Sequence, residues 1–449
     1  MVDDNPNLCT RANVILTLEK IHQGESLAWM LDGFLNDIRG RERAFAHELL
    51  LGVLRHWHAV SRIGESLMKT PLTDISVLCA LNMGVYELLY MNTPGYAVIN
   101  ETLNALKSIN KNHGVGLTNA ILRKVAIHQQ KYLKKVNKNH SLPNWLAKKI
   151  KQDWGAEGEN YYEILGQNLR KNAPIFLRVN PKFITVDEYA NLLTQAQIDF
   201  KILPLGVADQ QVICLNDRVK IQDLPYFSDG WVSVQDRHAQ LCGHILGQLD
   251  LPTSLSWLDA CTAPGGKLAQ MLELSESGVF HMKHITAFDS DERRLGRVHE
   301  NLARLHLSDQ AKIICADGRT YQAAMPFDVI VLDAPCTATG VVRRHPDIAL
   351  LRKEQDVEQT VCLQADILAN MWRNLAVNGY LMYVTCSLLK VENEQQILDF
   401  LAKNADAKVA DFHLTLPNQI KRSIGYQCLP LNEYDGDGFY YAVLQKGCV

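Results

Sequence analysis

Apolar residues recur at intervals of three and four from Arg11 to about Lys138, as at Val14, Leu18 and Ile21. This spacing places them on one face of a helix and so predicts a series of amphipathic helices. Glycine and proline divide the stretch into pieces of about 10 to 18 residues, which is helix length. We therefore predict an all-α bundle as a first domain, residues 1–140. The predicted breaks are Gly24, Gly33, Gly40, Thr70–Pro71 and Thr93–Gly95.

The pattern changes after the polar stretch that precedes Pro143. A helical passage runs through about Arg170, and then Ile175–Val179 alternates like a strand. A helix over residues 186–196 lies among further short strands at 201–205, 211–215 and 230–234. Helices and strands that alternate over so short a stretch predict linker helices and a small α+β domain, residues 141–237.

The last two hundred residues alternate regularly between apolar strand patterns and helical patterns. Such β-α-β alternation predicts a parallel, doubly wound sheet, which we assign to residues 238–449. Ligands of these sheets bind at the carboxyl ends of the strands, so the residues that follow each strand are the candidates for chemistry. The predicted strands cover residues 255–258, 284–288, 312–314, 327–332 and 379–384.

Composition narrows the class of protein. The chain has 449 residues, of which 47% are hydrophobic and 21% charged, and this excludes a disordered, collagen-like or small disulfide-rich protein. No apolar run approaches the roughly 18 residues that a membrane span needs, and the first eight residues are polar. Eleven cysteines without any C-x-x-C pair indicate free thiols in a reducing compartment. We expect a cytoplasmic monomer that binds no membrane and no metal, since the histidines are dispersed as well.

A net charge of −3 hides a strongly basic segment. Residues 107–151 contain eleven bases and no acid, whereas the rest of the chain has 35 bases against 49 acids. A concentrated basic segment is typical of a surface that binds a phosphate backbone. It is also typical of an ordinary solvated helix face, so charge alone does not decide between the two.

Three features at successive strand ends indicate an adenosine-containing ligand. A glycine pair, Gly265–Gly266, follows the first strand and opens a helix, whose amino terminus favours a carboxylate or phosphate. The segment is not a Walker loop, because Leu268 stands at the position where such a loop needs a hydroxyl side chain. Asp289 ends the next strand, where doubly wound folds bind ribose, and Asp317 follows the third, in position to accept from an adenine amine. Each Asp alone is as typical of a turn or helix cap, but the ordered set favours the ligand.

Two cysteines at the next strand ends supply the candidate chemistry. Cys336 lies in Asp333-Ala334-Pro335-Cys336, and Cys386 lies between Thr385 and Ser387. A single free cysteine is most often a small buried apolar residue. Two of them at adjacent strand ends, beside an acid, would face one cleft.

The string D-A-P-C-x-x-T-G-V-x-R-R-H-P-D at residues 333–347, with A-P-G-G-K before it and T-C-S after it, resembles the RNA 5-methylcytosine methyltransferases. The chain is most similar to their RsmB (Sun) family, which methylates a cytidine of bacterial small-subunit ribosomal RNA. Residues 238–449 carry the motifs, including the closing 435–442. The helical part, at 41–45 and 117–124, resembles the RNA-binding NusB fold. The implied fold class is multidomain: a NusB-like bundle, a small ferredoxin-like (RRM-like) α+β domain and a Rossmann-like class I methyltransferase domain.

The resemblance implies S-adenosylmethionine as cofactor and small-subunit ribosomal RNA as partner. Asp289 would hold the ribose, Asp317 would lie by the adenine, and Asp333 would line the cofactor site and contact the N3 edge of the base. The loop implied to hold the methionine part is Cys261, Thr262, Ala263, Pro264, Gly265, Gly266 and Lys267.

The resemblance further implies that Cys386 attacks C6 of cytosine and that Cys336 assists release. C5 of cytosine is a poor nucleophile, and a thiolate added at C6 activates it. A free thiol is only a few per cent ionised at pH 7, so a helper is needed, with Lys267 and the run Arg343–His345 as candidates. The run Arg343–His345 could instead bind RNA phosphates. Pro335-Cys336 also has the form of the nucleophile of DNA cytosine methyltransferases, but Thr385-Cys386 and the family pattern favour Cys386.

Two other functions stay open at this point: a transfer-RNA 5-methylcytosine enzyme, and a non-catalytic RNA-binding assembly factor. A transfer-RNA enzyme would not be expected to carry the helical N-terminal part. A non-catalytic assembly factor would not need both cysteines. Thr262, Leu268 and Thr337 depart from the usual family strings, but none of them replaces a reacting group. Phe439 and Tyr440 are candidates for stacking on a flipped base.

Overall fold

The computed structural model describes residues 8–36, 38–138, 140–158, 160–216, 219–251 and 255–448. Most of the polar N-terminal stretch interpreted above, residues 1–7, lies outside the described residues. The chain divides into two units, Met1–Asn172 with Val342–Lys353, and Ala173–Val341 with Glu354–Val449. The predicted domain boundaries at residues 140 and 237 stay predictions.

The first unit is helical, as the spacing of its apolar residues predicts. Leu18, Leu50 and Leu81 are each at most 1% exposed and belong to one hydrophobic core. The helices are α1 (Thr10–His22), α2 (Leu27–Asn36), α3 (Gly40–Leu67), α4 (Ile75–Tyr90), α5 (Gly95–Ser108), α6 (Asn112–Ile127), α7 (Gln129–Asn137), α8 (Asn144–Trp154), α9 (Tyr161–Asn168) and α14 (Ile348–Leu351).

One predicted helix break, at Gly33, is wrong, and so is the predicted helix length of about 10 to 18 residues for α3. Gly33 lies inside α2, where no atom approaches within 4 Å of the position of a Cβ, so an exposed glycine there costs only about 1 kcal/mol. Helix α3 extends over 28 residues and contains Gly52 in its interior. A Cβ at Gly52 would meet the Tyr86 hydroxyl at 2.0 Å, so this glycine allows Tyr86 to pack closely.

Residues Val342–Lys353, which follow the loop after one of the central strands, belong to the helical unit. The Leu27 N–H donates to the Asp347 carboxylate (3.0 Å), and His58 Nε2 lies 3.0 Å from the Ala349 carbonyl oxygen. Leu350 packs against the helical core. Nothing in the local sequence pattern predicts this return of the chain, because it depends on contacts far apart in the sequence.

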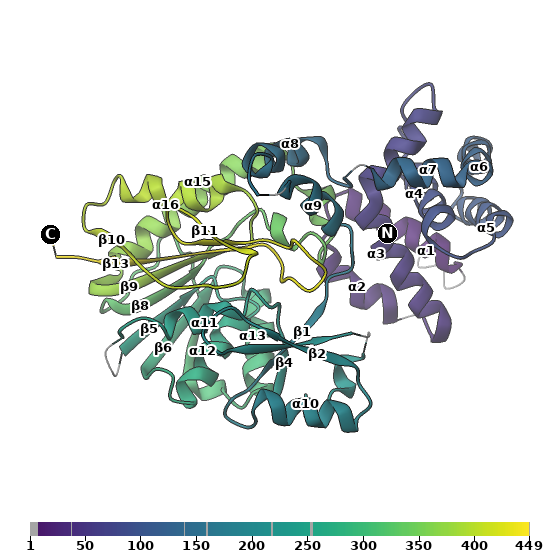
Figure 1. Cartoon of the computed structure of the whole chain (residues 1–449). Helices are drawn as coiled ribbons and strands as arrows, with labels where there is room; N and C mark the ends of the chain where they lie inside the picture. The colour runs from purple at the N-terminus through teal and green to yellow at the C-terminus, as the bar shows by residue number, and fades with distance from the viewer. Residues whose placement is uncertain are drawn as a thin grey trace. The chain divides into compact units, whose positions relative to one another are not determined.

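The second unit contains an antiparallel sheet of four strands in the order β2-β3-β1-β4. Helix α10 (Val186–Gln195) packs on one face of this sheet through Tyr189 and Leu193 (Figure 1). The strands are β1 (Ile175–Val179), β2 (Phe200–Pro204), β3 (Gln211–Leu215) and β4 (Val232–Val234). The four predicted strands are confirmed.

The second unit also contains a nine-stranded sheet with the order β11-β12-β13-β9-β8-β5-β6-β7, in which β10 pairs with β13. The five strands from β9 to β7 are parallel, as predicted. They are followed by an antiparallel extension, in which the pattern did not predict β11 and β12, because these strands have three residues each. The strands are β5 (Leu255–Ala260), β6 (Met282–Asp289), β7 (Ala311–Cys315), β8 (Phe327–Asp333), β9 (Leu375–Thr385), β10 (Ala407–Ala410), β11 (Gln419–Lys421), β12 (Tyr426–Cys428) and β13 (Phe439–Lys446).

Helices cover both faces of the nine-stranded sheet (Figure 1). One face carries α11 (Leu241–Leu246), α12 (Gly266–Glu276) and α13 (Glu292–Arg304), and the other carries α15 (Glu354–Arg373) and α16 (Glu394–Leu401). Burial on both faces explains the continuous apolar runs of strands such as β8. Within the ranges given above, no helix is both long and apolar enough to cross a membrane.

Candidate active site

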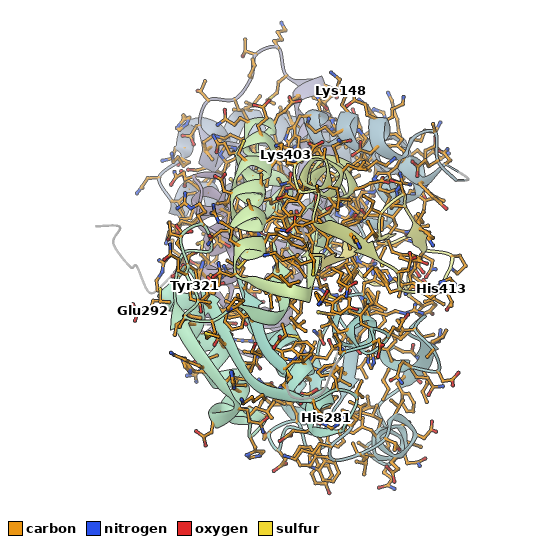
Figure 2. The ribbon with its side chains drawn as sticks, turned by 90° about the vertical axis from the view of Figure 1, so that its left-hand side faces the viewer. Lys148, His281, Glu292, Tyr321, Lys403 and His413 are labelled. Atoms are coloured by element: carbon orange, nitrogen blue, oxygen red, sulfur yellow. The ribbon has the colours of Figure 1, made fainter. Side chains whose placement is uncertain are left out.

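The sequence motifs lie at neighbouring carboxyl ends of the parallel strands. Asp289 ends β6 and pairs with Cys315 at the end of β7, so the loops after these strands lie side by side. Glu292 follows β6 and Tyr321 follows β7, and both are labelled in Figure 2. Asp333 ends β8 and pairs with Val384 of β9, which brings the two cysteine loops to one place.

The Sγ atoms of Cys336 and Cys386 lie 3.4 Å apart, within hydrogen-bond distance. The loops that carry them are joined by the Gly340 N–H, which donates to the Cys386 carbonyl (2.9 Å). A Cβ at Gly340 would lie 2.3 Å from the carbonyl oxygen of Gly438, so only glycine permits this approach. The hydrogen bond with Cys386, together with burial, raises the pKa of Cys336 well above its usual value.

A buried ion pair lies beside the cysteines. Lys267 Nζ is 2.6 Å from Asp333 Oδ2, and the two side chains are 11% and 27% exposed. Burial opposes the lysine charge, but the Asp333 carboxylate outweighs it and raises the pKa of Lys267. Of the two predicted helpers, Lys267 lies within electrostatic reach of Cys386. Arg343 is 1% exposed in the helical unit, so the prediction that it grips RNA phosphates is wrong for this residue.

A buried carboxylate holds the two cysteine loops together. Glu392 accepts hydrogen bonds from the Thr337 N–H (2.8 Å) and hydroxyl (2.6 Å), and also from the Ser387 hydroxyl. Thr337 follows Cys336 and Ser387 follows Cys386. The sequence analysis missed Glu392, because an acid near the start of a helix is also typical of an ordinary cap.

The glycine loop between β5 and α12 is fixed from several sides. Gly265 adopts a left-handed φ of +91° at the start of α12, which explains the glycine. The buried Asp289 carboxylate accepts from the Ala263 N–H (3.2 Å), and Arg294 donates to the Ala263 carbonyl (2.7 Å). Asn301 donates to the Pro264 carbonyl (3.2 Å). The loop is thus held in one conformation by contacts with α13 and with the end of β6.

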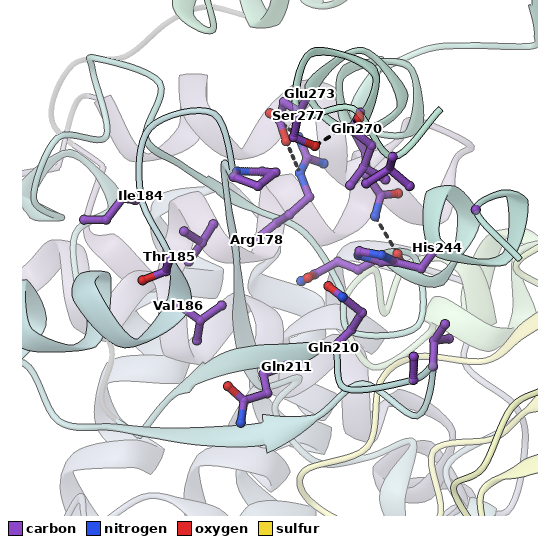
Figure 3. A pocket seen from close by; sticks show the side chains of 18 of the residues that line it. Arg178, Ile184, Thr185, Val186, Gln210, Gln211, His244, Gln270, Glu273 and Ser277 are labelled. Atoms are coloured by element: carbon purple, nitrogen blue, oxygen red, sulfur yellow. Dashed lines mark hydrogen bonds and ion pairs between the residues drawn. The ribbon is translucent and has the colours of Figure 1, made fainter. Parts of the chain in front are cut away.

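The small domain also fixes this loop. Arg178 of β1 donates to the Gly266 carbonyl (2.9 Å) and forms a buried ion pair with Glu273 of α12 (2.8 Å; Figure 3). Arg178 and Glu273 also line a cavity of about 570 Å³, together with Gln270 and His244 (Figure 3). The two cysteines and the strand-end acids do not line it. The cavity is therefore separate from the candidate active site.

Asp259, at the end of β5, is the second acid of the site that the sequence analysis missed. Burial raises its pKa to about 7, although the Thr262 hydroxyl donates to one carboxylate oxygen. The other oxygen, Oδ1, is buried and has no hydrogen-bond partner among the described residues. A carboxylate buried next to Asp289 and Asp333 needs a cationic or donor group to satisfy it.

Asp317 differs from the other acids, because it lies in an exposed turn after β7. Its carboxylate binds Arg319, two residues later, at 2.5 Å, and this hydrogen bond lowers the pKa of Asp317. The ring of Tyr321 in the same turn lies 5.0 Å from that of Phe288.

Three family models match successive parts of the chain. The model for the NusB family matches residues 10–127, and the model for an RsmF/B-like ferredoxin-like domain matches residues 142–222. The model described as 16S rRNA methyltransferase RsmB/F matches residues 248–445. The predicted fold class, in three parts, is confirmed.

Similar proteins cover the chain from end to end. The ribosomal RNA small subunit methyltransferase B of Pasteurella multocida is 38% identical over 98% of this chain and 96% of its own length. That of Serratia proteamaculans is 37% identical over 99% of both chains. The chain belongs to the ribosomal RNA small subunit methyltransferase B family. The crystal structure of PH0851 has the same fold, with a TM-score of 0.77 and 18% identity over 98% of this chain and 99% of that chain.

Membership of the methyltransferase B family confirms the predicted enzyme class, an S-adenosylmethionine-dependent methyltransferase. The site fits such a cofactor, which carries a sulfonium and an ammonium as well as a carboxylate. Buried Asp259, with its unpartnered Oδ1, is suited to a cation, and the amino terminus of α12 is suited to a carboxylate. In the described ranges, no three His, Cys, Asp or Glu side chains form a group that could hold a metal ion.

One further expectation for this methyltransferase needs correction. Tyr440 is fully buried, and its hydroxyl donates to the Ile424 carbonyl (2.7 Å), so it is not available to stack on a base. Strand alternation points Tyr440 into the core with Tyr383. Phe439, on the opposite face of β13, is 5% exposed, and its ring lies 5.2 Å from Lys267 Nζ.

Proposed function

We propose that this chain transfers a methyl group from S-adenosylmethionine to C5 of a cytidine in small-subunit ribosomal RNA. The observation that carries the proposal is the pair of sulfur atoms of Cys336 and Cys386, 3.4 Å apart, next to the ion pair of Lys267 and Asp333. A scaffold protein has no use for two thiols and a buried charge pair in one cleft. The names of the full-length relatives support ribosomal RNA as the substrate.

The cofactor would be held by the glycine loop and the strand-end acids. When bound, S-adenosylmethionine supplies an electrophilic methyl group. The helix amino terminus at Gly265 and Gly266 would bind its carboxylate, and Asp259 its ammonium. Asp289 would accept from the ribose hydroxyls. Asp317 would accept from the adenine amine if its carboxylate turned away from Arg319, or if one carboxylate oxygen stayed bound to Arg319 and the other accepted from the amine.

Cys386 is the proposed nucleophile. Its Sγ would form a bond to C6 of cytosine, which makes C5 an enamine-like carbon. C5 would then take the methyl group from the cofactor, with S-adenosylhomocysteine as the leaving group. A base then removes the C5 proton, the electron pair restores the C5–C6 double bond, and the C6–S bond breaks. The nearby Lys267 charge would favour the Cys386 thiolate both before attack and on departure.

Cys336 is proposed to assist release. The Cys336 thiol lies 3.4 Å from the Cys386 sulfur, so it can donate a proton to that sulfur as the C6–S bond breaks. Asp333 would contact the N3 edge of the base, where a proton shared between its carboxyl group and N3 would offset the negative charge that thiolate attack at C6 places on the ring. Lys267 would hold Asp333 in position for this contact.

The basic segment from Lys107 to Lys151 is the proposed RNA-binding surface of the helical unit. Nine of its eleven bases are exposed to solvent, as a surface that binds phosphates requires. The enzyme would act in the cytoplasm, which agrees with eleven cysteines that are all free thiols.

The test is methyl transfer from labelled S-adenosylmethionine to unmodified small-subunit ribosomal RNA and, separately, to transfer RNA. Wild type, Cys386→Ala and Cys336→Ala would be compared, with nucleosides identified after digestion and trapped adducts detected on a denaturing gel. We expect wild type to place label in 5-methylcytidine of ribosomal RNA. The label should be lost in Cys386→Ala and replaced by a stable adduct in Cys336→Ala. An adduct in Cys386→Ala would reverse the two cysteines, and label in transfer RNA alone would reject the substrate.

A further inference from the structure

Three aromatic rings form an exposed stack beside the small sheet. The ring centroids of Tyr226 and Trp231 are 4.2 Å apart, with planes 16° from parallel. Phe183 lies 6.2 Å from Trp231, with planes 9° from parallel. Tyr226 is 48% exposed and Phe183 is 36% exposed, so these rings do not serve a hydrophobic core. We propose that this stack, Phe183–Trp231–Tyr226, is a platform on which an unpaired base of the RNA substrate stacks.

The platform is rigid before any ligand binds. The Asn180 N–H donates to the Trp231 carbonyl (2.9 Å), and the Tyr189 hydroxyl donates to the Pro225 carbonyl (2.8 Å). Tyr226 itself has a left-handed φ of +53°, an uncommon conformation for a bulky residue, which the surrounding loop maintains. A ring held in place at this cost, and still half exposed, is prepared for a contact outside the chain.

The loop that carries the stack is anchored to the methyltransferase domain. Arg304, at the end of α13, donates to the carbonyls of Phe227 (2.8 Å) and Val232 (3.0 Å), and its guanidinium lies 4.2 Å from the Phe227 ring centroid. A small cavity of about 110 Å³ is lined by both Phe227 and Gly266 of the cofactor loop. RNA on the platform would therefore lie near the start of the cofactor helix, on the same unit as the cysteines.

Flat geometry favours a nucleobase over a peptide. Nearly parallel rings leave a planar face at the end of the stack, whereas proline-rich peptides dock in grooves between aromatic side chains. Stacking between a base and an aromatic ring tolerates any base and suits single-stranded RNA. Lys182, whose Nζ lies 5.6 Å from the Phe183 ring centroid, adds positive charge at one end and also pairs with Glu276.

This inference rests on the proposed RNA substrate. The test distinguishes failure of the platform from failure of the proposed function. The affinity of the full-length protein for a single-stranded fragment of small-subunit ribosomal RNA would be measured at several salt concentrations. Tyr226→Asn removes the ring but tolerates the left-handed backbone, Tyr226→Phe keeps the ring, and Tyr96→Ala removes a 74% exposed tyrosine elsewhere. Wild-type methyl transfer to the RNA would be assayed in parallel.

We expect Tyr226→Asn to bind about tenfold more weakly, with an unchanged dependence on salt, because stacking releases no counterions. Tyr226→Phe and Tyr96→Ala should bind like wild type. The platform would be rejected if Tyr226→Asn bound RNA as tightly as wild type does, or if Tyr226→Phe lost as much affinity as Tyr226→Asn. Methyl transfer by wild type would still support the proposed function in either case. A proline-rich peptide that binds wild type but not Tyr226→Asn, with RNA affinity unchanged, would assign the stack to a protein partner instead.

A second measurement needs no variant, in case Tyr226→Asn does not fold. RNA that contains 4-thiouridine at single unpaired positions would be crosslinked to wild type by light, and the crosslinked peptides would be mapped. Crosslinks within residues 224–231 would support the platform. Crosslinks that map elsewhere at every position would contradict it.

Discussion

The two units of this chain differ in whether their functional charges are exposed to solvent or buried in pairs. In the helical unit, nine bases of the segment from Lys107 to Lys151 are exposed, and they repel one another across open solvent. In the second unit, two charge pairs that flank the glycine loop are largely buried, Lys267 with Asp333 and Arg178 with Glu273. Exposed charges attract RNA over long distances and are screened by salt, whereas buried charges are fixed in place for chemistry. Substitutions in the two regions should therefore differ in both size and salt dependence.

The largest effect is expected for the buried pair. Lys267→Met removes the cation next to Asp333 and Cys386, and we expect kcat to fall by about 10²- to 10³-fold, the range typical of losing one preorganised charge. The fall would be measured as kcat for methyl transfer across a range of pH.

The matched control is Lys283→Met, which removes an exposed lysine from β6 of the same sheet. It should leave kcat and the pH profile unchanged. If Lys283→Met and Lys267→Met lost activity equally, burial of the charge would not be what distinguishes the two regions.

A smaller effect on activity is expected for Glu392→Gln. The amide cannot accept all three hydrogen bonds from Thr337 and Ser387, so the two cysteine loops lose a shared anchor. We expect kcat to fall by about 10- to 100-fold, as for a misplaced reacting group, with KM nearly unchanged. Glu394→Gln, two residues away in a partly exposed pair with Arg422, is the control and should keep most of the activity. A change in KM alone would show that Glu392 affects binding rather than alignment.

The sequence predicts the parts of this site that depend on local pattern. Strand ends, the glycine turn and the two cysteine motifs follow from alternation and spacing along the chain. The Glu392 anchor and the unpartnered Asp259 do not, because each depends on contacts between loops that only the folded sheet brings together. The same reason explains the short antiparallel strands β11 and β12, which a three-residue apolar signal cannot distinguish from a turn.

Charge reversal in the helical unit should affect binding, not chemistry. Lys131, Lys134 and Lys135 are exposed on α7, and replacing all three by Glu should weaken RNA binding by about tenfold or more at low salt. If each contacts one phosphate, the slope of log K against log salt falls by about 2. Methyl transfer at saturating RNA should stay near wild type.

The control for charge is the same reversal at Lys403, Lys408 and Lys421, which are exposed on the second unit. It changes the net charge of the chain equally and should leave the salt slope as it is. Equal losses for the two triple variants would mean that net charge, rather than the helical surface, attracts the RNA.

The smallest effect concerns a buried titratable group within the helical unit. Burial lowers the pKa of His58 to about 4, although its ring bonds the Ala349 carbonyl, and Arg62 and His140 lower it further. The unfolded chain therefore takes up a proton before the folded one does, and stability is lost as pH falls from about 6.5 toward 4. Between pH 7.5 and pH 6, one such histidine accounts for about 0.8 kcal/mol. His58→Gln, which retains a donor for Ala349, should reduce the pH dependence of hydrogen exchange in α3, whereas His113→Gln, at an exposed position, should not. An undiminished pH dependence in His58→Gln would mean that other groups, His56 first among them, account for the acid sensitivity of this unit.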